Sequence, residues 1–199
     1  MNKSIAVFCA SATGTKPEYV ETARELGRRI AERSYGLVYG GATVGTMGEL
    51  ADATLAAGGK VVGVIPGVII DLEIAHRDLT ELHIVGTMHE RKTLMAERAD
   101  AFVALPGGYG TLDEFVEVVT WAQLRIHTKP CVMVNVGGYY DSLLAFFDTA
   151  VEQGLIKPEN RGLVQVARDA SEALDMIERE WSRHPEVPAH DASIDELVR

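Results

Sequence analysis

Short apolar runs alternate with longer amphipathic segments along the chain. A short apolar run between turn signals indicates a buried strand, and apolar residues spaced three or four apart indicate a helix. This alternation predicts a doubly wound, Rossmann-like α/β fold, in which helices cover both faces of a mostly parallel sheet. The predicted strands are 4–11, 36–40, 59–66, 82–85, 101–105, 130–136 and 163–166, and the predicted helices include 17–33, 87–99, 115–124, 140–153 and 170–184.

The length of 199 residues is enough for one full hydrophobic core. We expect a single Rossmann-like domain over residues 1–184. Residues 185–199 contain prolines and scattered acids without a clear period, so we expect a flexible C-terminal tail there.

A glycine-rich turn follows the strand predicted at 101–105. Residues 105–114 are Leu-Pro-Gly-Gly-Tyr-Gly-Thr-Leu-Asp-Glu. Glycine permits positive φ and lets backbone N–H groups approach a ligand closely. The first turn of a helix has unpaired N–H groups and the positive end of the helix dipole, so it favours an anion such as phosphate. We expect a phosphate-binding turn here, with Thr111 both capping the helix and donating its hydroxyl to a phosphate oxygen.

Glu114 has two interpretations that its spacing leaves open. It follows Thr111 by three residues, so the two side chains can form a capping box without a chemical role. The alternative is a catalytic carboxylate, placed one helical turn beyond the phosphate.

A second glycine-rich strand-to-helix turn occupies residues 40–49. The two turns together can frame a ligand from two sides, with Gly41 and Gly45 among its contacts. Alternatively, these glycines only let a helix pack closely on the sheet. Ser11 follows the first strand, and ligands of α/β sheets bind at the carboxyl ends of the strands, so we expect Ser11 to contact the ligand unless it belongs to a plain turn.

Arg91 and Lys92 lie in the first turns of the helix predicted at 87–99. A positive side chain near a helix N-terminus is mildly unfavourable for the dipole. The pair therefore suggests a facing anion, although a solvated charged face is the common alternative.

The composition excludes several partners and chemistries. Lys and Arg number 19 against 29 Asp and Glu, for a net charge of −10, which argues against nucleic acid and anionic membranes as partners. Cys9 and Cys131 lie in apolar runs, without metal or redox spacing. No run is long enough to cross a bilayer and no signal peptide precedes the first strand, so we expect a cytoplasmic protein.

Several common motifs are missing from the sequence. There is no His/Cys/Asp cluster with metal spacing, no Gly-x-Ser-x-Gly elbow and no Gly-x-x-x-x-Gly-Lys-Ser/Thr loop. The dinucleotide pattern Gly-x-Gly-x-x-Gly fails because Asp113 stands at its third glycine position. A phosphate-binding turn, a carboxylate and an Arg-Lys pair remain.

These features resemble the Lonely Guy (LOG) family over about residues 4–180. Residues 106–114 match its motif Pro-Gly-Gly-x-Gly-Thr-x-x-Glu, residues 88–92 match Met-x-x-Arg-Lys, and residues 40–48 resemble its first glycine-rich turn. Members are cytokinin riboside 5′-monophosphate phosphoribohydrolases, which hydrolyse the N-glycosidic bond of an adenine nucleotide to the free base and ribose 5-phosphate. Proteins with this motif are often labelled lysine decarboxylases, but nothing here indicates a pyridoxal phosphate site. The resemblance implies a nucleotide-binding catalytic domain that needs no cofactor, a small-molecule nucleoside 5′-monophosphate as substrate, and a homodimer.

The motif positions also imply which residues act. Glu114 and Arg91 correspond to the catalytic pair. Lys92 and Thr120 align with further substrate contacts, and Glu73 does so only by its distance before Arg91 in a variable segment. The backbone expected to hold the 5′-phosphate is that of Gly107, Gly108, Tyr109, Gly110 and Thr111.

The resemblance leaves finer questions open. Thr46 stands where many members have leucine, which bears on fine specificity. Two other functions remain as alternatives: a general AMP nucleosidase, and a non-catalytic carrier of a phosphate-bearing cofactor such as the molybdenum cofactor carriers. The helix around Trp121 is a candidate dimer interface, and a core position fits Trp121 about equally well.

Overall fold

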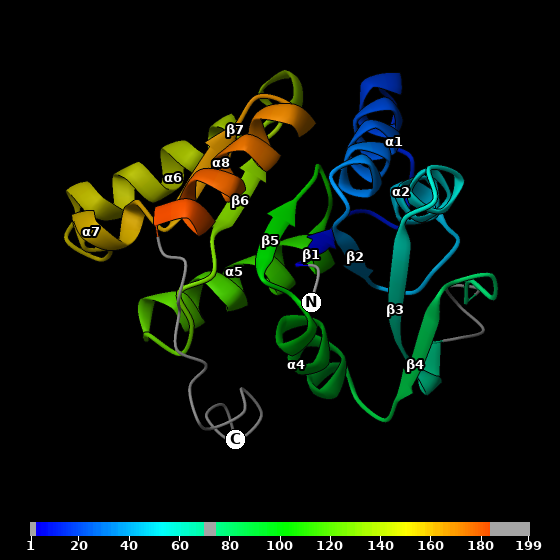
Figure 1. Ribbon diagram of the computed structural model, residues 1–199. Helices are drawn as coiled ribbons and strands as arrows, with labels where there is room; N and C mark the ends of the chain where they lie inside the picture. The colour runs from blue at the N-terminus through cyan, green and yellow to red at the C-terminus, as the bar shows by residue number, and fades with distance from the viewer. Residues whose placement is uncertain (1–2, 70–74, 184–199) are drawn as a thin grey trace.

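The computed structural model describes residues 3–69 and 75–183. In this part of the chain, seven strands form one sheet in the order β4-β3-β2-β1-β5-β6-β7, and every neighbouring pair is parallel. The strands are β1 (Ser4–Phe8), β2 (Gly36–Tyr39), β3 (Lys60–Pro66), β4 (Glu81–Val85), β5 (Ala101–Ala104), β6 (Cys131–Val134) and β7 (Val164–Ala167). The doubly wound fold expected from the sequence is confirmed, and the described sheet is entirely parallel (Figure 1).

The helices follow the strands in the expected alternation. They are α1 (Pro17–Glu32), α2 (Gly45–Ala56), α4 (Met88–Arg98), α5 (Tyr109–Gln123), α6 (Asp141–Glu152), α7 (Pro158–Arg161) and α8 (Ala170–Arg183), with short 3-10 turns η1 (Gly67–Ile69) and η2 (Val136–Gly138). The short α7 was not expected from the pattern. Residues 185–199 and Glu73 lie outside the described residues.

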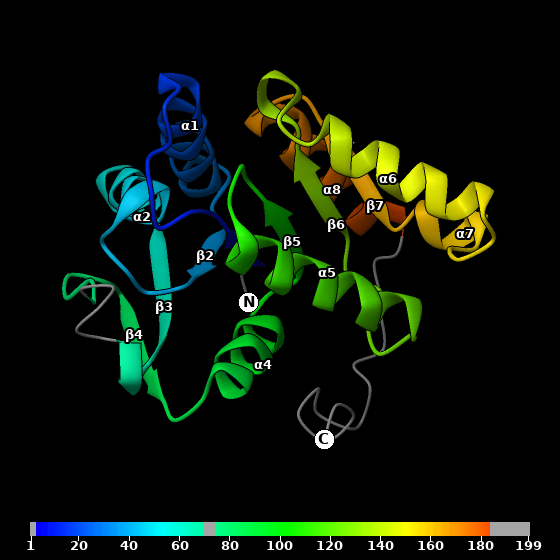
Figure 2. The same cartoon turned by 180° about the vertical axis from the view of Figure 1, so that it is seen from behind.

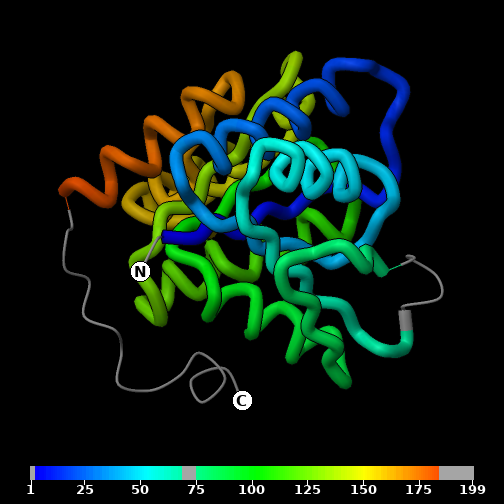
Figure 3. Tube along the Cα trace, turned by 45° about the vertical axis from the view of Figure 1, so that its right-hand side comes forward, coloured from blue at the N-terminus to red at the C-terminus, as the bar shows by residue number. Residues whose placement is uncertain are grey.

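Helices cover both faces of the sheet. Helices α1, α2 and α8 pack on one face, and α1 and α2 run side by side there (Figure 1 and Figure 3). Helices α4, α5 and α6 pack on the other face (Figure 2). Alternate residues of β1 serve the two cores: Ile5 and Val7 face the first, whereas Ala6 and Phe8 face the second. Trp121 is 6 % exposed and belongs to the second core, so it is a core residue in this chain.

The topology sets the position of a ligand crevice. The chain leaves the central strand β1 towards β2, β3 and β4, and it then returns to β5 on the other side of β1. The loops after β1 and β5 therefore lead in opposite directions, and this switch point is where open α/β sheets bind their ligands.

The two cysteines and the lengths of the described helices agree with the sequence pattern. Cys9 and Cys131 are buried free thiols, and burial raises the pKa of each to about 12, so both stay protonated. Within residues 3–69 and 75–183, no helix is both long and apolar enough to span a bilayer.

Candidate active site

Arg91 and Glu114 meet at the carboxyl end of the sheet. Nη1 of Arg91 lies 3.9 Å from Oε1 of Glu114, and the two side chains are only 6 % and 11 % exposed. Arg91 lies near the start of α4, which Thr87 caps by accepting a hydrogen bond from the backbone N–H of Glu90 at 3.1 Å. Two side chains from separate sequence motifs, one on α4 and one on α5, thus form a buried charged pair.

The guanidinium of Arg91 is held by backbone carbonyls. Nε donates to the carbonyl oxygen of Val64 at 3.2 Å, and Nη2 donates to the carbonyl oxygen of Gly40 at 3.1 Å. Val64 belongs to β3 and Gly40 directly follows β2. The guanidinium of Arg91 is therefore fixed against β3 and the end of β2. It is buried, so the alternative of a solvated charged face does not apply to Arg91.

The start of α5 corrects one expectation. Gly108 is the N-cap, so the helix begins at Tyr109 and Thr111 is its third residue. The prediction that Thr111 caps the helix was wrong. The capping-box interpretation of Glu114 fails for the same reason, because a capping box needs its Ser or Thr at the N-cap. Glu114 instead lies in the second turn of α5, with its side chain directed to Arg91.

The N-terminus of α5 has open space around it. A Cβ atom built on Gly108 or Gly110 would meet nothing within 4 Å, and Tyr109 is 95 % exposed. The N–H groups of the first helical residues have no acceptor within the helix. The open space at Gly108 and Gly110, close to the buried carboxylate of Glu114, makes this end of α5 suited to an anionic group of a ligand. Gly107 differs, because its Cβ would lie 2.0 Å from Oγ1 of Thr111, so its role is close packing.

Two tyrosines support this turn from the side of β6. Tyr140 donates its hydroxyl to the carbonyl oxygen of Leu105 at 2.6 Å, and Tyr139 donates to the carbonyl oxygen of Gly107 at 2.8 Å. Burial raises the pKa of Tyr140 above its usual range, so its hydroxyl remains a donor. Neither tyrosine belongs to a motif that predicts a role at the site. Their sequence position did place them near the site, because they follow Gly138 shortly after β6, the strand that pairs with β5.

The glycine-rich turn after β2 is closely packed. Gly45 has a φ of +59°, and its Cβ would lie 2.3 Å from the backbone of Ser11 and Ala12. Gly41 has a φ of +80°, with its Cβ 3.3 Å from the backbone nitrogen of Val64. The packing interpretation therefore accounts for both glycines, and Ser11 lies exposed in the loop that Gly45 contacts.

Thr46 ties the same turn to the end of β1. Its hydroxyl accepts from the backbone N–H of Ala10 at 3.0 Å and donates to the carbonyl oxygen of Ala10 at 3.1 Å. Thr46 is 2 % exposed. Thr46 thus fixes the path of the chain after β1.

Lys92 and Thr120 make contacts within the protein. The ammonium of Lys92 lies 3.2 Å from Asp113 and 3.1 Å from Glu117, so it connects α4 to α5. Burial opposes its charge, but the ion pairs outweigh this effect and raise its pKa. Thr120 donates its hydroxyl to the carbonyl oxygen of Val116 in its own helix at 2.8 Å.

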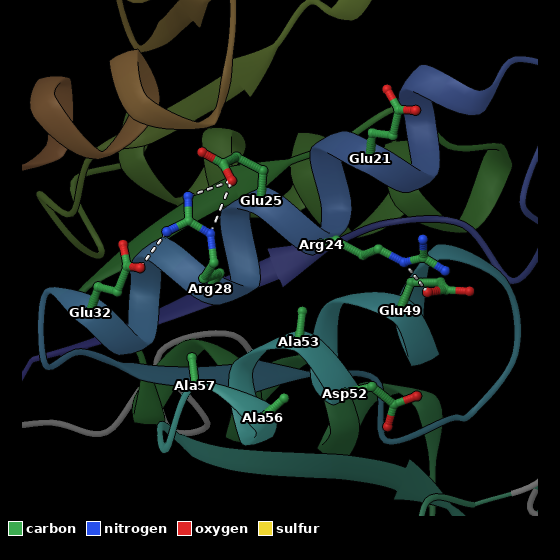
Figure 4. Close-up of a pocket in the computed structure, with 10 residues that line it drawn as sticks. All are labelled: Glu21, Arg24, Glu25, Arg28, Glu32, Glu49, Asp52, Ala53, Ala56 and Ala57. Atoms are coloured by element: carbon green, nitrogen blue, oxygen red, sulfur yellow. Dashed lines mark hydrogen bonds and ion pairs between the residues drawn. The ribbon is translucent and has the colours of Figure 1, made fainter.

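Two other kinds of site come into question in the described chain: a metal site and a surface hollow. Within residues 3–69 and 75–183, no group of three or more His, Cys, Asp or Glu side chains is placed to hold a metal ion. A hollow of about 780 Å³ lies between α1 and α2 (Figure 4). Its floor includes Ala53 and Ala56, and its arginines are paired with neighbouring glutamates, as the dashed lines show. Arg91 and Glu114 do not line this hollow.

Comparison with known proteins agrees with the motifs. Residues 47–177 match the family model described as "Possible lysine decarboxylase". The cytokinin riboside 5′-monophosphate phosphoribohydrolase of Rhodococcoides fascians is 50 % identical over 176 residues, which cover 88 % of this chain and 89 % of that protein. LOG7 of Arabidopsis thaliana, which carries the same enzyme name, is 49 % identical over 88 % of this chain and 81 % of its own. This chain belongs to the LOG family.

Proteins with other functions in their names share the fold of this LOG family member. The molybdenum cofactor carrier protein MCP from Chlamydomonas reinhardtii is 25 % identical, and the two structures align with a TM-score of 0.71 over 92 % of this chain and 99 % of that one. DNA processing protein A from Helicobacter pylori shares the fold at 13 % identity and a TM-score of 0.54. The fold alone therefore does not identify the chemistry.

Proposed function

We propose that this LOG family member hydrolyses the N-glycosidic bond of adenine-type (cytokinin) riboside 5′-monophosphates. The products are the free base and ribose 5-phosphate. The observation that carries the proposal is the buried Arg91–Glu114 pair beside the open N-terminus of α5. The names of relatives that are 49–50 % identical support the same reaction.

The carboxylate suits the chemistry of this bond. Cleavage of a ribosyl bond develops positive charge on the sugar, as in glycoside hydrolysis. Glu114 can stabilise that charge or activate the attacking water. Its position in the second turn of α5 places it beyond a phosphate bound at the N-terminus of the same helix.

The phosphate and Arg91 contribute by positioning. We assign the 5′-phosphate to the backbone N–H groups of residues 107–111 and to the hydroxyl of Thr111. The phosphate is remote from the bond that breaks, so its binding energy can help to place the reacting centre. Arg91, held by two carbonyls, is expected to fix ribose hydroxyls beside Glu114. Further proposed substrate contacts are Glu73, Lys92, Thr120 and Ser11. Gly41 and Gly45 are proposed as contacts through their backbone only, in addition to the close packing described above.

A carrier of a phosphate-bearing cofactor is a second candidate. The fold similarity to MCP favours it. A carrier needs neither the carboxylate nor the arginine, however, so the buried pair favours the enzyme. A general AMP nucleosidase uses the same site and differs only in its preferred base.

One assay separates these functions. The protein is incubated with AMP and with isopentenyladenosine monophosphate, and the free base is measured. Faster release from the second nucleotide supports the proposed function, and release mainly from AMP supports the nucleosidase. No release from either nucleotide, together with tight nucleotide binding, supports the carrier and contradicts the enzyme.

We also propose the setting in which the enzyme works. Residues 1–184 act as one catalytic domain followed by a tail at 185–199, and the protein is a cytoplasmic homodimer. The net charge of −10 disfavours nucleic acid and anionic membranes as partners. Exposed apolar side chains on α4 and α5, including Met88 and Val116, offer surface for a second copy. Light scattering of the purified protein tests the dimer; a monomer mass at assay concentration would contradict it.

A further inference from the structure

We propose that Gly40 is a positioning residue for Arg91. The inference rests on the proposed function for its catalytic consequence, but its structural part stands separately. The lack of a side chain at Gly40 creates the space in which the guanidinium of Arg91 lies. The usual reason for a glycine, a positive φ, does not apply here, because Gly40 is not among the positive-φ glycines of the described chain.

The geometry around Gly40 carries the proposal. A Cβ atom on Gly40 would lie 2.1 Å from Nη2 and 3.3 Å from Cζ of Arg91. The same Nη2 donates to the carbonyl oxygen of Gly40 at 3.1 Å. Gly40 therefore serves Arg91 twice: its carbonyl accepts a hydrogen bond, and its missing side chain admits the group that donates it.

The position of the guanidinium is constrained on its other sides. Nε of Arg91 is bonded to the carbonyl of Val64, and Nη1 lies 3.9 Å from Glu114. Arg91 is 5 % exposed, so its guanidinium cannot avoid a methyl group at residue 40 by a small rotation into solvent. The guanidinium must shift as a unit, which changes its distance from Glu114.

A second neighbour of Gly40 is more adaptable. The Cβ atom would also lie 3.1 Å from Sδ of Met47. A thioether at the end of a flexible side chain can move by a few tenths of an ångström. The main conflict is therefore with Arg91.

The direct test is Gly40→Ala, which we expect to lower kcat by about 100-fold, because a misplaced catalytic group has an effect of this order. KM should change far less, because the phosphate site on α5 is untouched. Gly59→Ala is the matched control. Its Cβ would lie 2.6 Å from Ala31 and 2.8 Å from Thr54, at the turn before β3, and its φ is not positive. This control should lower Tm and leave kcat unchanged.

A double-mutant cycle shows whether Gly40 acts through Arg91. Tm is measured for Gly40→Ala, Arg91→Ala and the double variant. Gly40→Ala should lower Tm in the wild-type background and leave it unchanged where Arg91 is already truncated. Arg91→Met serves as the background if Arg91→Ala does not fold, because methionine lacks Nη2.

The outcomes separate this inference from the proposed function. An equal fall in Tm in both backgrounds, or wild-type kcat in Gly40→Ala, overturns the role of Gly40. If the wild-type protein releases no base at all, the proposed function fails, and the Tm cycle still decides whether Gly40 makes the space for Arg91.

Discussion

The turn after β2 and the turn after β5 both join a buried strand to a helix, and both are rich in glycine. In the first, Gly45 lies against the backbone after β1 and Gly40 lies against Arg91, so an added methyl group would clash with its neighbours. In the second, Gly108 and Gly110 have open space where a side chain would be. Similar sequences thus meet different physical needs: the first turn packs the protein around the buried guanidinium of Arg91, and the second leaves open space at the start of α5.

This difference teaches how a site can be divided between two motifs. The turn after β2 contributes rigidity, since its glycines allow close contacts with the end of β1 and with Arg91. The turn after β5 contributes the N–H groups of the first turn of α5, which have no acceptor within the helix, and leads to the carboxylate of Glu114. Substitutions of the glycines in the first turn should therefore act mainly on stability and kcat, and substitutions of the glycines in the second mainly on KM.

The largest effect is expected for Gly45→Ala. The residue has a φ of +59°, and its new Cβ would lie 2.3 Å from the backbone of Ala12. Backbone atoms cannot move aside as a flexible side chain can, so we expect a loss of more than about 4 kcal/mol in the free energy of unfolding. Urea unfolding measures it. A loss below about 1 kcal/mol would show that the first turn is not closely packed.

The other end of α5 gives a pH-dependent effect that involves neither turn. His127 is buried, with Nε2 2.8 Å from the carbonyl oxygen of Val118 and Nδ1 accepting from the N–H of Lys129 at 3.1 Å. Burial lowers the pKa of His127 to about 4, despite the opposing hydrogen bond to Val118. Protonation would also place a second donor at Nδ1, facing the N–H of Lys129.

The sign follows from proton binding. Between about pH 6.5 and pH 4 the unfolded chain protonates this histidine and the folded protein does not. The contribution of His127 to stability is therefore fully present above about pH 6.5 and is lost as pH falls towards 4, by about 3 kcal/mol. The free energy of unfolding is measured at pH 7 and at pH 4.5 for the wild type and His127→Gln. The decrease from pH 7 to pH 4.5 should be smaller for His127→Gln than for the wild type. An equal fall in both proteins would contradict this assignment.

Tyr140→Phe should have a smaller effect on the second turn. It leaves the buried carbonyl of Leu105 without its hydroxyl donor, which costs about 1–3 kcal/mol. It should also raise KM for the nucleotide, because the turn is less firmly held. Tyr139→Phe is the matched control; its bond to Gly107 is exposed, so its cost should be below about 1 kcal/mol. A larger loss for Tyr139→Phe than for Tyr140→Phe would reverse our assignment of the supporting residue.

Gly110→Ala should have the smallest effect on stability, and the sign opposite to that of Gly45→Ala. Residue 110 is in the first turn of α5, its φ is not positive, and a Cβ atom there meets nothing within 4 Å. Alanine is a better helix former, so the free energy of unfolding should stay constant or rise by up to about 1 kcal/mol. KM for the nucleotide should rise, because the methyl group occupies space assigned to phosphate. An unchanged KM would place the phosphate elsewhere.

Most of the fold could be predicted from the sequence. The buried strands are continuous apolar runs, such as Ala101–Ala104, and this pattern is typical of parallel strands covered on both faces. The short α7 was missed because Pro158–Arg161 is too brief for a helical period to show. The start of α5 was placed too late because Gly108 and Gly110 are poor helix formers, although glycine is an acceptable N-cap.

The site was only partly predictable. The motifs indicated Arg91 and Glu114 separately, and the structure brings the two side chains together. The carbonyls that hold Arg91 are 27 and 51 residues away in the chain, so no local pattern reports them. Lys92 was expected to contact substrate, and its ion pairs with α5 depend on helix packing that spacing does not show.

The most direct test of the account uses Glu114→Gln. Purified wild type and variant are given AMP and isopentenyladenosine monophosphate, base release is followed over time, and nucleotide binding is measured by calorimetry. We predict that base release is abolished while the nucleotide still binds, because the amide keeps the shape of the side chain and removes its charge. Base release at the wild-type rate would contradict the catalytic role of Glu114.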